Sequence, residues 1–276
     1  MFLRTISLWL TLVLISCGGG GGGGSSNATP ASANPPSAPV APAANPITTI
    51  DVLGLITPGV EGLFVDSDLR IQHLFNVAND VLSDNGADLN FELVHLEVIE
   101  AADGGDTALL LEDLTYGADP FENVAALRDQ YSADLIVLFR PYANDGRCGY
   151  AWIGGFSQQG DFSDPAEADF GYSVVAANCG DYTLLHELGH NLGLAHSRRE
   201  TDQGGTYMWS VGYGVEQDFV TIMASPSEFN ASRMPKFSSP NSTCNDQPCG
   251  INHQQDQGAD ALRSIEIVKD QVANYR

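Results

Sequence analysis

Eleven residues of this chain place three histidines and one glutamate at fixed spacings. The stretch from His186 to His196 reads His-Glu-Leu-Gly-His-Asn-Leu-Gly-Leu-Ala-His. On a helix, side chains four residues apart share one face, so His186 and His190 can direct ring nitrogens at a single metal ion, with Glu187 beside them. The spacing predicts a helix that carries a metal site on one face.

The third histidine requires the chain to turn after that helix. A straight helix would carry His196 more than two turns away from His186, out of reach of the same ion. Gly193 lacks a Cβ and can take the left-handed conformation that ends a helix, so the chain can fold back and deliver His196 as a third ligand. Three neutral imidazoles leave the fourth tetrahedral position of zinc to water, which is typical of a catalytic site.

This ligand set predicts hydrolytic chemistry with one catalytic zinc ion. Zinc lowers the pKa of bound water towards about 7, which makes a hydroxide-like nucleophile available at neutral pH. Glu187 is then placed to take a proton from that water during attack on a carbonyl and to return it to the leaving amine. We predict His186, His190 and His196 as metal ligands and Glu187 as the general base.

The motif resembles that of the metzincin zinc endopeptidases, a clan that also has a methionine turn beneath the zinc. The segment Thr221-Ile222-Met223-Ala224 is similar to that turn in its amino-acid sequence and in its distance after His196. The resemblance covers most of residues 47–276 and is greatest to bacterial reprolysin-like members. Ser197 after the third histidine, and the absence of a tyrosine two places after Met223, depart from the reprolysin and astacin patterns and leave the subfamily open.

The resemblance implies an α/β (α+β) fold of the metzincin type. We expect a mixed, mostly parallel five-stranded sheet with an antiparallel edge strand, an active-site helix, and a small loop-rich C-terminal subdomain that ends in a helix. The segment Gly149-Tyr150-Ala151-Trp152-Ile153-Gly154-Gly155 resembles the clan's edge strand, along which an extended peptide pairs. The expected substrate-binding residues are Tyr150, Ala151, Trp152, Ile153 and Gly154; an ordinary sheet edge is the alternative.

Apolar patterning predicts strands that alternate with helices before the motif. We expect strands at 48–56, 91–99, 135–139 and 172–177, with helices at 67–83 and 121–131. Such alternation implies a largely parallel sheet with covered faces. Asp181 is the expected N-cap of the active-site helix, and a last helix is expected at 256–275. The inward side chains expected of the first helix are Leu69, Leu74, Val77, Ala78 and Leu82.

The charge balance excludes one class of partner. Acidic residues outnumber basic ones by 35 to 12, giving a formal net charge of -23. Because the acidic excess is spread along the chain, nucleic acid is not an expected partner, and a hydrated surface suited to an extracellular setting is favoured. Structural calcium is conceivable, but no calcium-binding loop supports it. Arg198 and Arg199 are assigned to a solvated loop rather than to selection of acidic substrate side chains.

The N-terminus is typical of an exported protein. An apolar run from about residue 6 to 15 is too short to span a bilayer and fits a signal peptide. It ends in Leu14-Ile15-Ser16-Cys17, which resembles the lipobox of bacterial lipoproteins; an ordinary secretory signal with an incidental cysteine is the alternative. We predict a signal peptide over 1–16, a lipidated Cys17 with a flexible Gly/Ser/Pro/Ala tether over 17–46, and a catalytic domain over 47–276.

Within that domain we expect an upper subdomain of about 47–193 and a lower one of about 194–276. Four cysteines remain besides Cys17, and an even count in an exported protein suggests two disulfides. We predict a local clip between Cys244 and Cys249, and a Cys148–Cys179 bond that ties the edge strand to the segment before the active-site helix. Other pairings stay open.

Taken together, these features predict a monomeric zinc-dependent endopeptidase that hydrolyses extracellular or periplasmic proteins while anchored to a bacterial membrane, with the outer membrane or cell surface favoured. One alternative is a surface binding or adhesion module that keeps the fold without turnover. Glu187 argues against it, since a binding module has no use for a base beside an open metal position. The other alternative, hydrolysis of a non-peptide amide or ester, is less expected because of the edge strand.

Overall fold

The computed structural model describes residues 46–276. The predicted signal peptide, Cys17 and the tether up to residue 45 lie outside the described residues. No helix within residues 46–276 is both long and apolar enough to cross a membrane.

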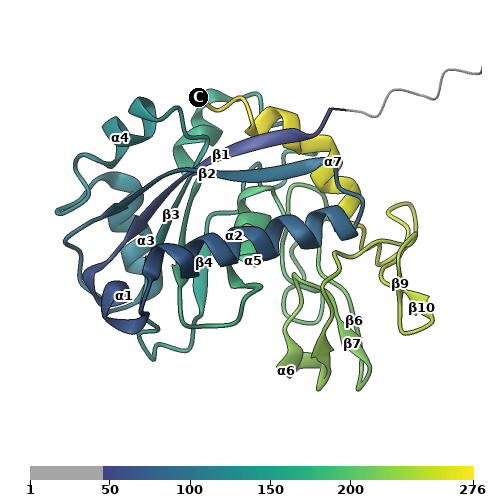
Figure 1. Ribbon diagram of the computed structural model, residues 1–276. Helices are drawn as coiled ribbons and strands as arrows, with labels where there is room; N and C mark the ends of the chain where they lie inside the picture. Colours follow the sequence, from purple (N-terminus) through teal and green to yellow (C-terminus); the bar gives the residue numbers. More distant parts are fainter. Residues whose placement is uncertain (1–45) are drawn as a thin grey trace, which may run out of the picture. The chain divides into compact units, whose positions relative to one another are not determined.

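A five-stranded sheet runs through the first half of the described chain, in the order β2-β1-β3-β5-β4 (Figure 1). Strands β1 (Thr48–Ile56), β2 (Leu89–Val98), β3 (Leu135–Arg140) and β5 (Tyr172–Ala176) are parallel. The edge strand β4 (Gly149–Ala151) is antiparallel to β5. The predicted mostly parallel sheet with an antiparallel edge strand is therefore confirmed.

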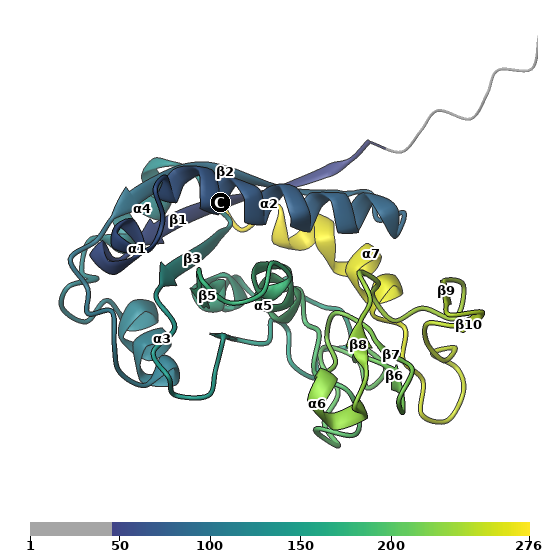
Figure 2. The same ribbon diagram turned by 60° about the horizontal axis from the view of Figure 1, so that its bottom comes forward.

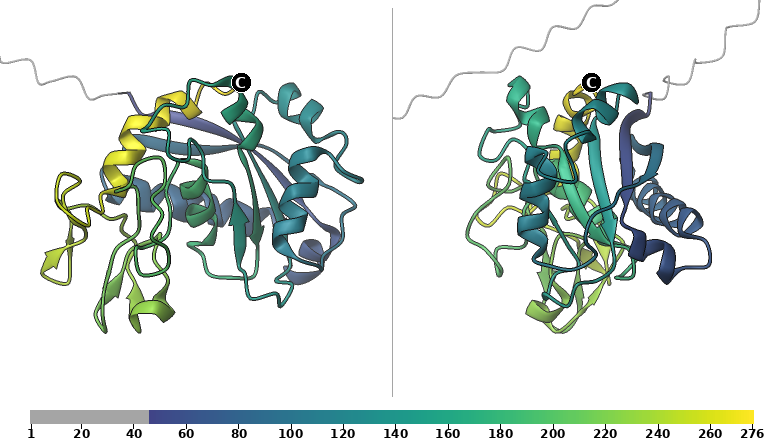
Figure 3. Two further views of the ribbon diagram at one scale, coloured as in Figure 1. Left: turned by 180° about the vertical axis from the view of Figure 1, so that it is seen from behind. Right: turned by 90° about the vertical axis from the view of Figure 1, so that its left-hand side faces the viewer.

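Both faces of this sheet are buried, which explains why its central strands are almost entirely apolar. Every residue of β3 is buried. Because side chains alternate along a strand, Val137 and Phe139 enter one apolar cluster, whereas Ile136 and Leu138 enter the other. The first cluster joins the sheet to α2 (Ser67–Asp84), α5 (Thr183–Asn191) and α7 (Ala261–Val272); the second joins it to α3 (Thr107–Tyr116) and α4 (Val124–Gln130). Figure 3 shows α2 and α3 on opposite sides of the sheet.

Helix α2 differs from the sequence prediction in the face that it buries. Its inward stripe follows helical spacing through Ile71, Leu74, Phe75, Ala78, Val81 and Leu82. Leu69 lies off this stripe in the first turn, where its backbone N–H donates to the capping carboxylate of Asp66, and its side chain is 67% exposed. The prediction that Leu69 faces inward was wrong.

Other element boundaries also moved. The sequence prediction missed α1 (Pro58–Leu63), α3 and the 3-10 helix η1 (Pro165–Phe170), and α4 is shorter than expected. The last helix begins at Ala261 rather than near residue 256, because Ile251 and Ala259 form an antiparallel bridge that holds the preceding residues outside the helix.

After α5 the chain consists mainly of loops. Short strands β6 (Gly214–Val215), β7 (Phe219–Val220) and β8 (Ser232–Arg233) form one sheet, with α6 (Pro226–Phe229) between β7 and β8. A small hairpin of β9 (Thr243–Cys244) and β10 (Gln247–Pro248) follows. Figure 2 shows α5 between the large sheet and these loops, and Leu188 of α5 shares an apolar cluster with Met223. The helix that carries the motif is thus packed on two sides.

Candidate active site

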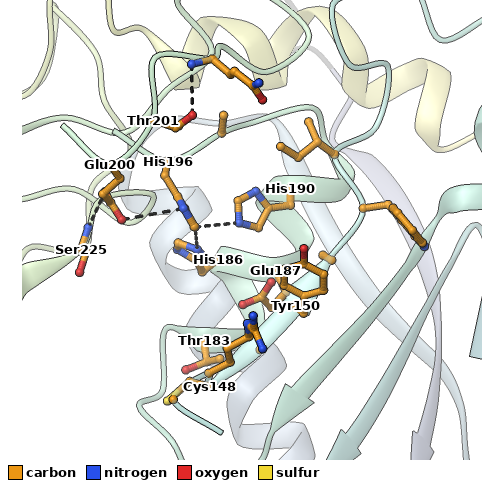
Figure 4. Close-up of a pocket in the computed structure, with 18 of the residues that line it drawn as sticks. Cys148, Tyr150, Thr183, His186, Glu187, His190, His196, Glu200, Thr201 and Ser225 are labelled. Atoms are coloured by element: carbon orange, nitrogen blue, oxygen red, sulfur yellow. Dashed lines mark hydrogen bonds and ion pairs between the residues drawn. The ribbon is translucent and has the colours of Figure 1, made fainter. Parts of the chain in front are cut away.

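The three motif histidines meet at one point. His186 and His190 project from α5, and His196 comes from the loop that follows (Figure 4). The Nε2 atom of His196 lies 3.0 Å from Nε2 of His186 and 3.2 Å from Nε2 of His190. The local spacing that suggested a shared ion therefore corresponds to a compact group of ring nitrogens.

The chain reverses where Gly193 ends α5. Gly193 has a φ of 78°, in the left-handed region, and its N–H donates to the carbonyl of His190 at 2.8 Å. The next N–H, of Leu194, donates to the carbonyl of Gly189 at 3.0 Å. This pair of bonds is the Schellman arrangement, which satisfies the last carbonyls of a helix. A Cβ on Gly193 would lie 2.9 Å from both the Gly154 oxygen and the Thr206 side chain, so crowding adds to the conformational demand for glycine.

Hydrogen bonds to the second ring nitrogens fix how the imidazoles are oriented. Nδ1 of His186 donates to the Ile222 carbonyl, and Nδ1 of His190 donates to the Leu194 carbonyl, each at 2.8 Å. Nδ1 of His196 lies 3.8 Å from a carboxylate oxygen of Glu200. Because a carbonyl can only accept, the proton of the first two rings stays on Nδ1 and the lone pair of Nε2 points into the group.

The electrostatics of the site favour neutral imidazoles. Burial lowers the pKa of all three rings; neighbouring imidazoles add to this for His186 and His190, and the pKa of His190 falls to about 3. Neutral imidazole is the form that binds a metal ion.

The three nitrogens fit a zinc ion. Two nitrogens that bind one tetrahedral zinc at about 2.1 Å lie roughly 3.4 Å apart, close to the observed separations of 3.0 and 3.2 Å. Across the described residues, the ligand atoms of His186, His190 and His196 form a group within 4.8 Å that could hold a metal ion. Three imidazoles with no fourth protein ligand in that group match a catalytic rather than a structural site.

Glu187 lies beside this group, in a tight space between α5 and β4. Its side chain is buried, and a Cβ built on Gly149 would lie only 2.4 Å from its Oε1 atom. Burial raises the pKa of Glu187 to about 8, although the charge of Arg233 opposes that shift. The carboxyl group and the histidines line one cavity of about 650 Å³, whose wall includes β4. Figure 4 shows Tyr150 and Glu187 close together in it.

The edge strand is shorter than its sequence resemblance suggested. Only Gly149–Ala151 form β4, and the N–H of Trp152 adds one long bond to Tyr172 at 3.4 Å. Beyond that point the segment hydrogen-bonds to the end of α5 instead of to β5. Nδ2 of Asn191 donates to the carbonyl of Trp152 at 3.1 Å, and the N–H of Gly154 donates to the carbonyl of His190 at 3.0 Å. Trp152, Ile153 and Gly154 therefore lie outside the strand.

One side of β4 faces the cavity without a strand partner. Within residues 46–276 the strand pairs with β5 alone, at the end of the sheet order. Tyr150, Ala151, Trp152 and Ile153 all line the cavity. An unpaired strand edge along a cavity wall can add an extended peptide through main-chain hydrogen bonds.

The methionine turn packs beneath α5. Met223 is fully buried, and a Cβ built on Gly189 would lie 2.7 Å from its sulfur. The residue before it, Ile222, supplies the carbonyl that receives the His186 proton. The turn thus contacts the motif helix both through its side chain and through its backbone.

Both predicted disulfides are present. Cys148 is bonded to Cys179 and Cys244 to Cys249. The first links the residue before β4 to the segment that leads into α5. The predicted N-cap in that segment was wrong: α5 begins at Thr183 after Tyr182, with no side-chain cap, and Asp181 instead accepts a 2.6 Å hydrogen bond from Arg70 of α2.

Sequence reasoning missed three charged residues of the cavity, Arg147, Glu200 and Arg233. Glu200 stands four places after His196, a spacing that could have drawn attention to it. Its Oε2 atom accepts hydrogen bonds from the Ser197 hydroxyl at 2.6 Å and from the Ser225 N–H at 3.0 Å. Arg233 has no local signal, since it follows Met223 by ten residues in a polar loop.

The side chains of Arg198 and Arg199 are not free in solvent, as the sequence prediction had them. Arg198 donates to the carbonyls of Met208 and Gly258, at 2.6 and 3.2 Å. Arg199 pairs with Glu216 and lies 4.0 Å above the ring of Phe229. Both guanidinium groups are thus occupied in holding loops together.

Comparisons with known proteins agree with this geometry. The family model described as Metallo-peptidase family M12B Reprolysin-like matches residues 64–255. A Peptidyl-Asp metalloendopeptidase of Pseudomonas aeruginosa is 34% identical over 249 residues, which cover 83% of this chain and 40% of that protein. The chain thus spans less than half the length of this relative.

A solved structure shares the fold. The structure titled "Structure of a chaperone-substrate complex" superposes with a TM-score of 0.64 at 21% sequence identity, over 83% of this chain and 35% of the other. At that identity the likeness concerns the fold alone. The family match, by contrast, covers the motif helix, the histidine turn and the methionine turn together. The chain belongs to the reprolysin-like M12B family of zinc metallopeptidases.

Proposed function

We propose that this protein is a zinc-dependent endopeptidase. The observation that carries the proposal is the placement of the Glu187 carboxyl group beside three convergent Nε2 atoms, in a cavity walled by a strand edge that has no partner. A binding module would need neither a buried acid at that position nor three imidazoles held in the metal-binding tautomer.

Each part of the cavity has a task in peptide hydrolysis. When bound, zinc would supply Lewis acidity and lower the pKa of water. β4 would hold the substrate main chain extended by hydrogen bonding along its free edge. Glu187 would accept a proton from the attacking water and then donate it to the leaving amine.

The proposal extends to the bond that is cleaved. The name of the Pseudomonas aeruginosa relative describes a metalloendopeptidase that acts on peptidyl-Asp. We propose that this chain also cleaves next to an aspartate, in extracellular or periplasmic proteins.

A chelator experiment tests the proposed activity. The full-length protein would be incubated with a mixed peptide library, with and without a zinc chelator, and then after zinc is added back. Cleavage that the chelator abolishes and zinc restores supports the proposal. Absence of such cleavage would favour a binding module instead. Cleavage of ester or non-peptide amide probes alone would favour a hydrolase that acts on non-peptide bonds.

The Glu187→Gln variant separates the base from the metal site. Removing a general base costs roughly a hundredfold to ten-thousandfold in rate, so peptide hydrolysis should fall by that factor while bound zinc stays stoichiometric. Glu216→Gln, at an exposed site paired with Arg199, is the matched control and should keep full activity. Retained hydrolysis in Glu187→Gln would rule out the assigned base.

We also propose that the protein is exported and anchored to a bacterial membrane through acylated Cys17. The two disulfides support the exported part, because such bonds persist in oxidising compartments. Labelling cells with a radioactive fatty acid should label the protein, and Cys17→Ser should abolish the label. Equal labelling of the variant would exclude the anchor.

A further inference from the structure

We infer that Arg233 binds the acidic side chain of the substrate residue next to the cleaved bond and thereby determines specificity. The inference rests on the proposed endopeptidase function and assigns a residue to its selectivity. It follows from the position of the guanidinium in the cavity, from its lack of an ion pair, and from the partners that the neighbouring arginines already have.

Arg233 is fixed in the same cavity as the proposed catalytic group. It lies at the end of β8, and it lines the cavity together with Glu187 and the three histidines. Its Nη2 atom donates to the Ala224 carbonyl at 3.0 Å, directly after Met223. The guanidinium is therefore attached to the methionine turn, which also orients His186, so its position relative to the histidines is set by that turn.

The guanidinium lacks a partner of opposite charge. Over residues 46–276, no carboxylate oxygen lies within 4.0 Å of it, and its buried Nε atom has no hydrogen-bond acceptor. The carboxylates of Glu200 and Glu187 act on it only from beyond ion-pair distance, and that of Glu200 is already occupied by Ser197 and Ser225. A cation that is largely removed from water and left unpaired is unfavourable, and a substrate carboxylate in the cavity would compensate it.

Arginine suits this task better than the other basic residues that approach the site. Arg147 lines the same cavity, but it forms a 3.3 Å ion pair with Asp106 and lies over the ring of Tyr150. Arg198 also has a buried Nε atom without an acceptor, but its guanidinium donates to the carbonyls of Met208 and Gly258 and does not line this cavity. Arg199 is paired with Glu216. The planar guanidinium fork matches a carboxylate in two parallel hydrogen bonds, which favours an acidic side chain over its amide.

The overall charge makes such a local cation necessary. With 35 acidic and 12 basic residues, the chain repels acidic peptides at long range. A preference for an acidic residue therefore has to arise from a contact inside the cavity, where the low dielectric strengthens a single charge pair. Arg233 is placed to provide that contact.

The test compares two peptides that differ only in one central residue, Asp or Asn. Because both are assayed with the same variant, any change in the zinc site divides out of the ratio of their kcat/KM values. We expect the unmodified chain to prefer Asp by roughly tenfold to a hundredfold, the range for hydrogen bonds to charged groups. Arg233→Gln should bring the ratio close to one, Arg233→Lys should keep part of it, and Arg147→Gln, the matched control, should leave it unchanged.

Each outcome is decisive. If the unmodified chain cleaves both peptides equally, or if Arg233→Gln keeps the full Asp preference, the inference is overturned while the endopeptidase function stands. If no chelator-sensitive cleavage occurs, the proposed function itself fails. Should Arg233→Gln not fold, as judged by circular dichroism and zinc content, the partial loss expected for Arg233→Lys carries the test, and an unchanged ratio there contradicts the inference. Mass spectrometry of the products identifies on which side of Asp the bond is cut.

Discussion

The Ile222 carbonyl oxygen accepts the Nδ1 proton of His186 at 2.8 Å, so the turn that carries Met223 determines the tautomer of a candidate zinc ligand. The relationship joins two segments 36 residues apart in the sequence. It means that the backbone of the methionine turn, and not only its side chain, supports the metal centre.

Gly193→Ala should destabilise the fold and weaken zinc binding. The left-handed conformation costs an alanine about 1–2 kcal/mol, and the close Gly154 oxygen and Thr206 side chain add an overpacking cost of about 1–3 kcal/mol. Gly86→Ala is the matched control, because Gly86 also follows a helix with a positive φ but has open space around it. Urea unfolding and zinc titration measure both variants. Equal losses of stability would show that crowding at Gly193 contributes nothing.

Glu200→Gln should lower zinc affinity by roughly tenfold or more, as is typical when a group that orients a ligand is removed. The carboxylate links the His196 ring to the Ser197 and Ser225 backbone N–H groups, and the neutral amide loses the charge that favours this arrangement. Competition with a chelator of known affinity measures the dissociation constant. An unchanged value would mean that Glu200 does not position His196.

The two disulfides should contribute unequally to stability. Chain-entropy arguments give about 4 kcal/mol for the Cys148–Cys179 bond and about 2 kcal/mol for the Cys244–Cys249 bond, since they span 31 and 5 residues. Paired serine variants of each bond, compared by denaturant unfolding, test the order. We also expect the Cys148→Ser, Cys179→Ser double variant to have a higher KM, because the Cys148–Cys179 bond holds the start of β4. A larger loss from the second pair would contradict the loop-length account.

Asp145→Asn should destabilise the protein at neutral pH and have a diminishing effect in acid. Burial raises the pKa of Asp145, but hydrogen bonds from Thr107 and the Arg147 N–H, with the charge of Arg140, bring it to about 2. The unfolded chain binds this proton at about pH 4, so the carboxylate contributes about 2 kcal/mol above pH 4 and loses it between pH 4 and pH 2. The difference in unfolding free energy between the two proteins, measured across that range, should shrink as the pH falls. A constant difference would contradict the assignment.

The convergence of the three candidate metal ligands could be predicted from the sequence because its signal is local. His186, His190 and Gly193 lie within one helix and its end, so helical spacing and one left-handed turn suffice to bring His196 back. The parallel sheet was equally accessible, because strands buried on both faces are recognisable as continuous apolar runs. The Cys148–Cys179 pairing followed from the expected neighbours of the edge strand, and the Cys244–Cys249 pairing from the short separation of the two cysteines along the chain.

The rest of the cavity depends on contacts between distant segments. Arg233 reaches it only because β8 pairs with β7 beside the methionine turn, and nothing in the surrounding polar residues indicates this. Asp181 looked like a helix cap from its position, but Arg70 of a distant helix supplies a stronger, charged partner. Leu69 looked like a core residue until the register of the helix against the sheet was known.

The space between Gly149 and Glu187 has a wider consequence. A single methyl group at position 149 would lie 2.4 Å from Oε1 of the proposed base, so the carboxyl group occupies volume into which any other side chain would push. The strand that would present the substrate and the helix that would perform the chemistry are therefore as close as a backbone without side chains permits. A side chain at this one position would therefore displace the proposed base while leaving every charged and metal-binding residue in the sequence unchanged.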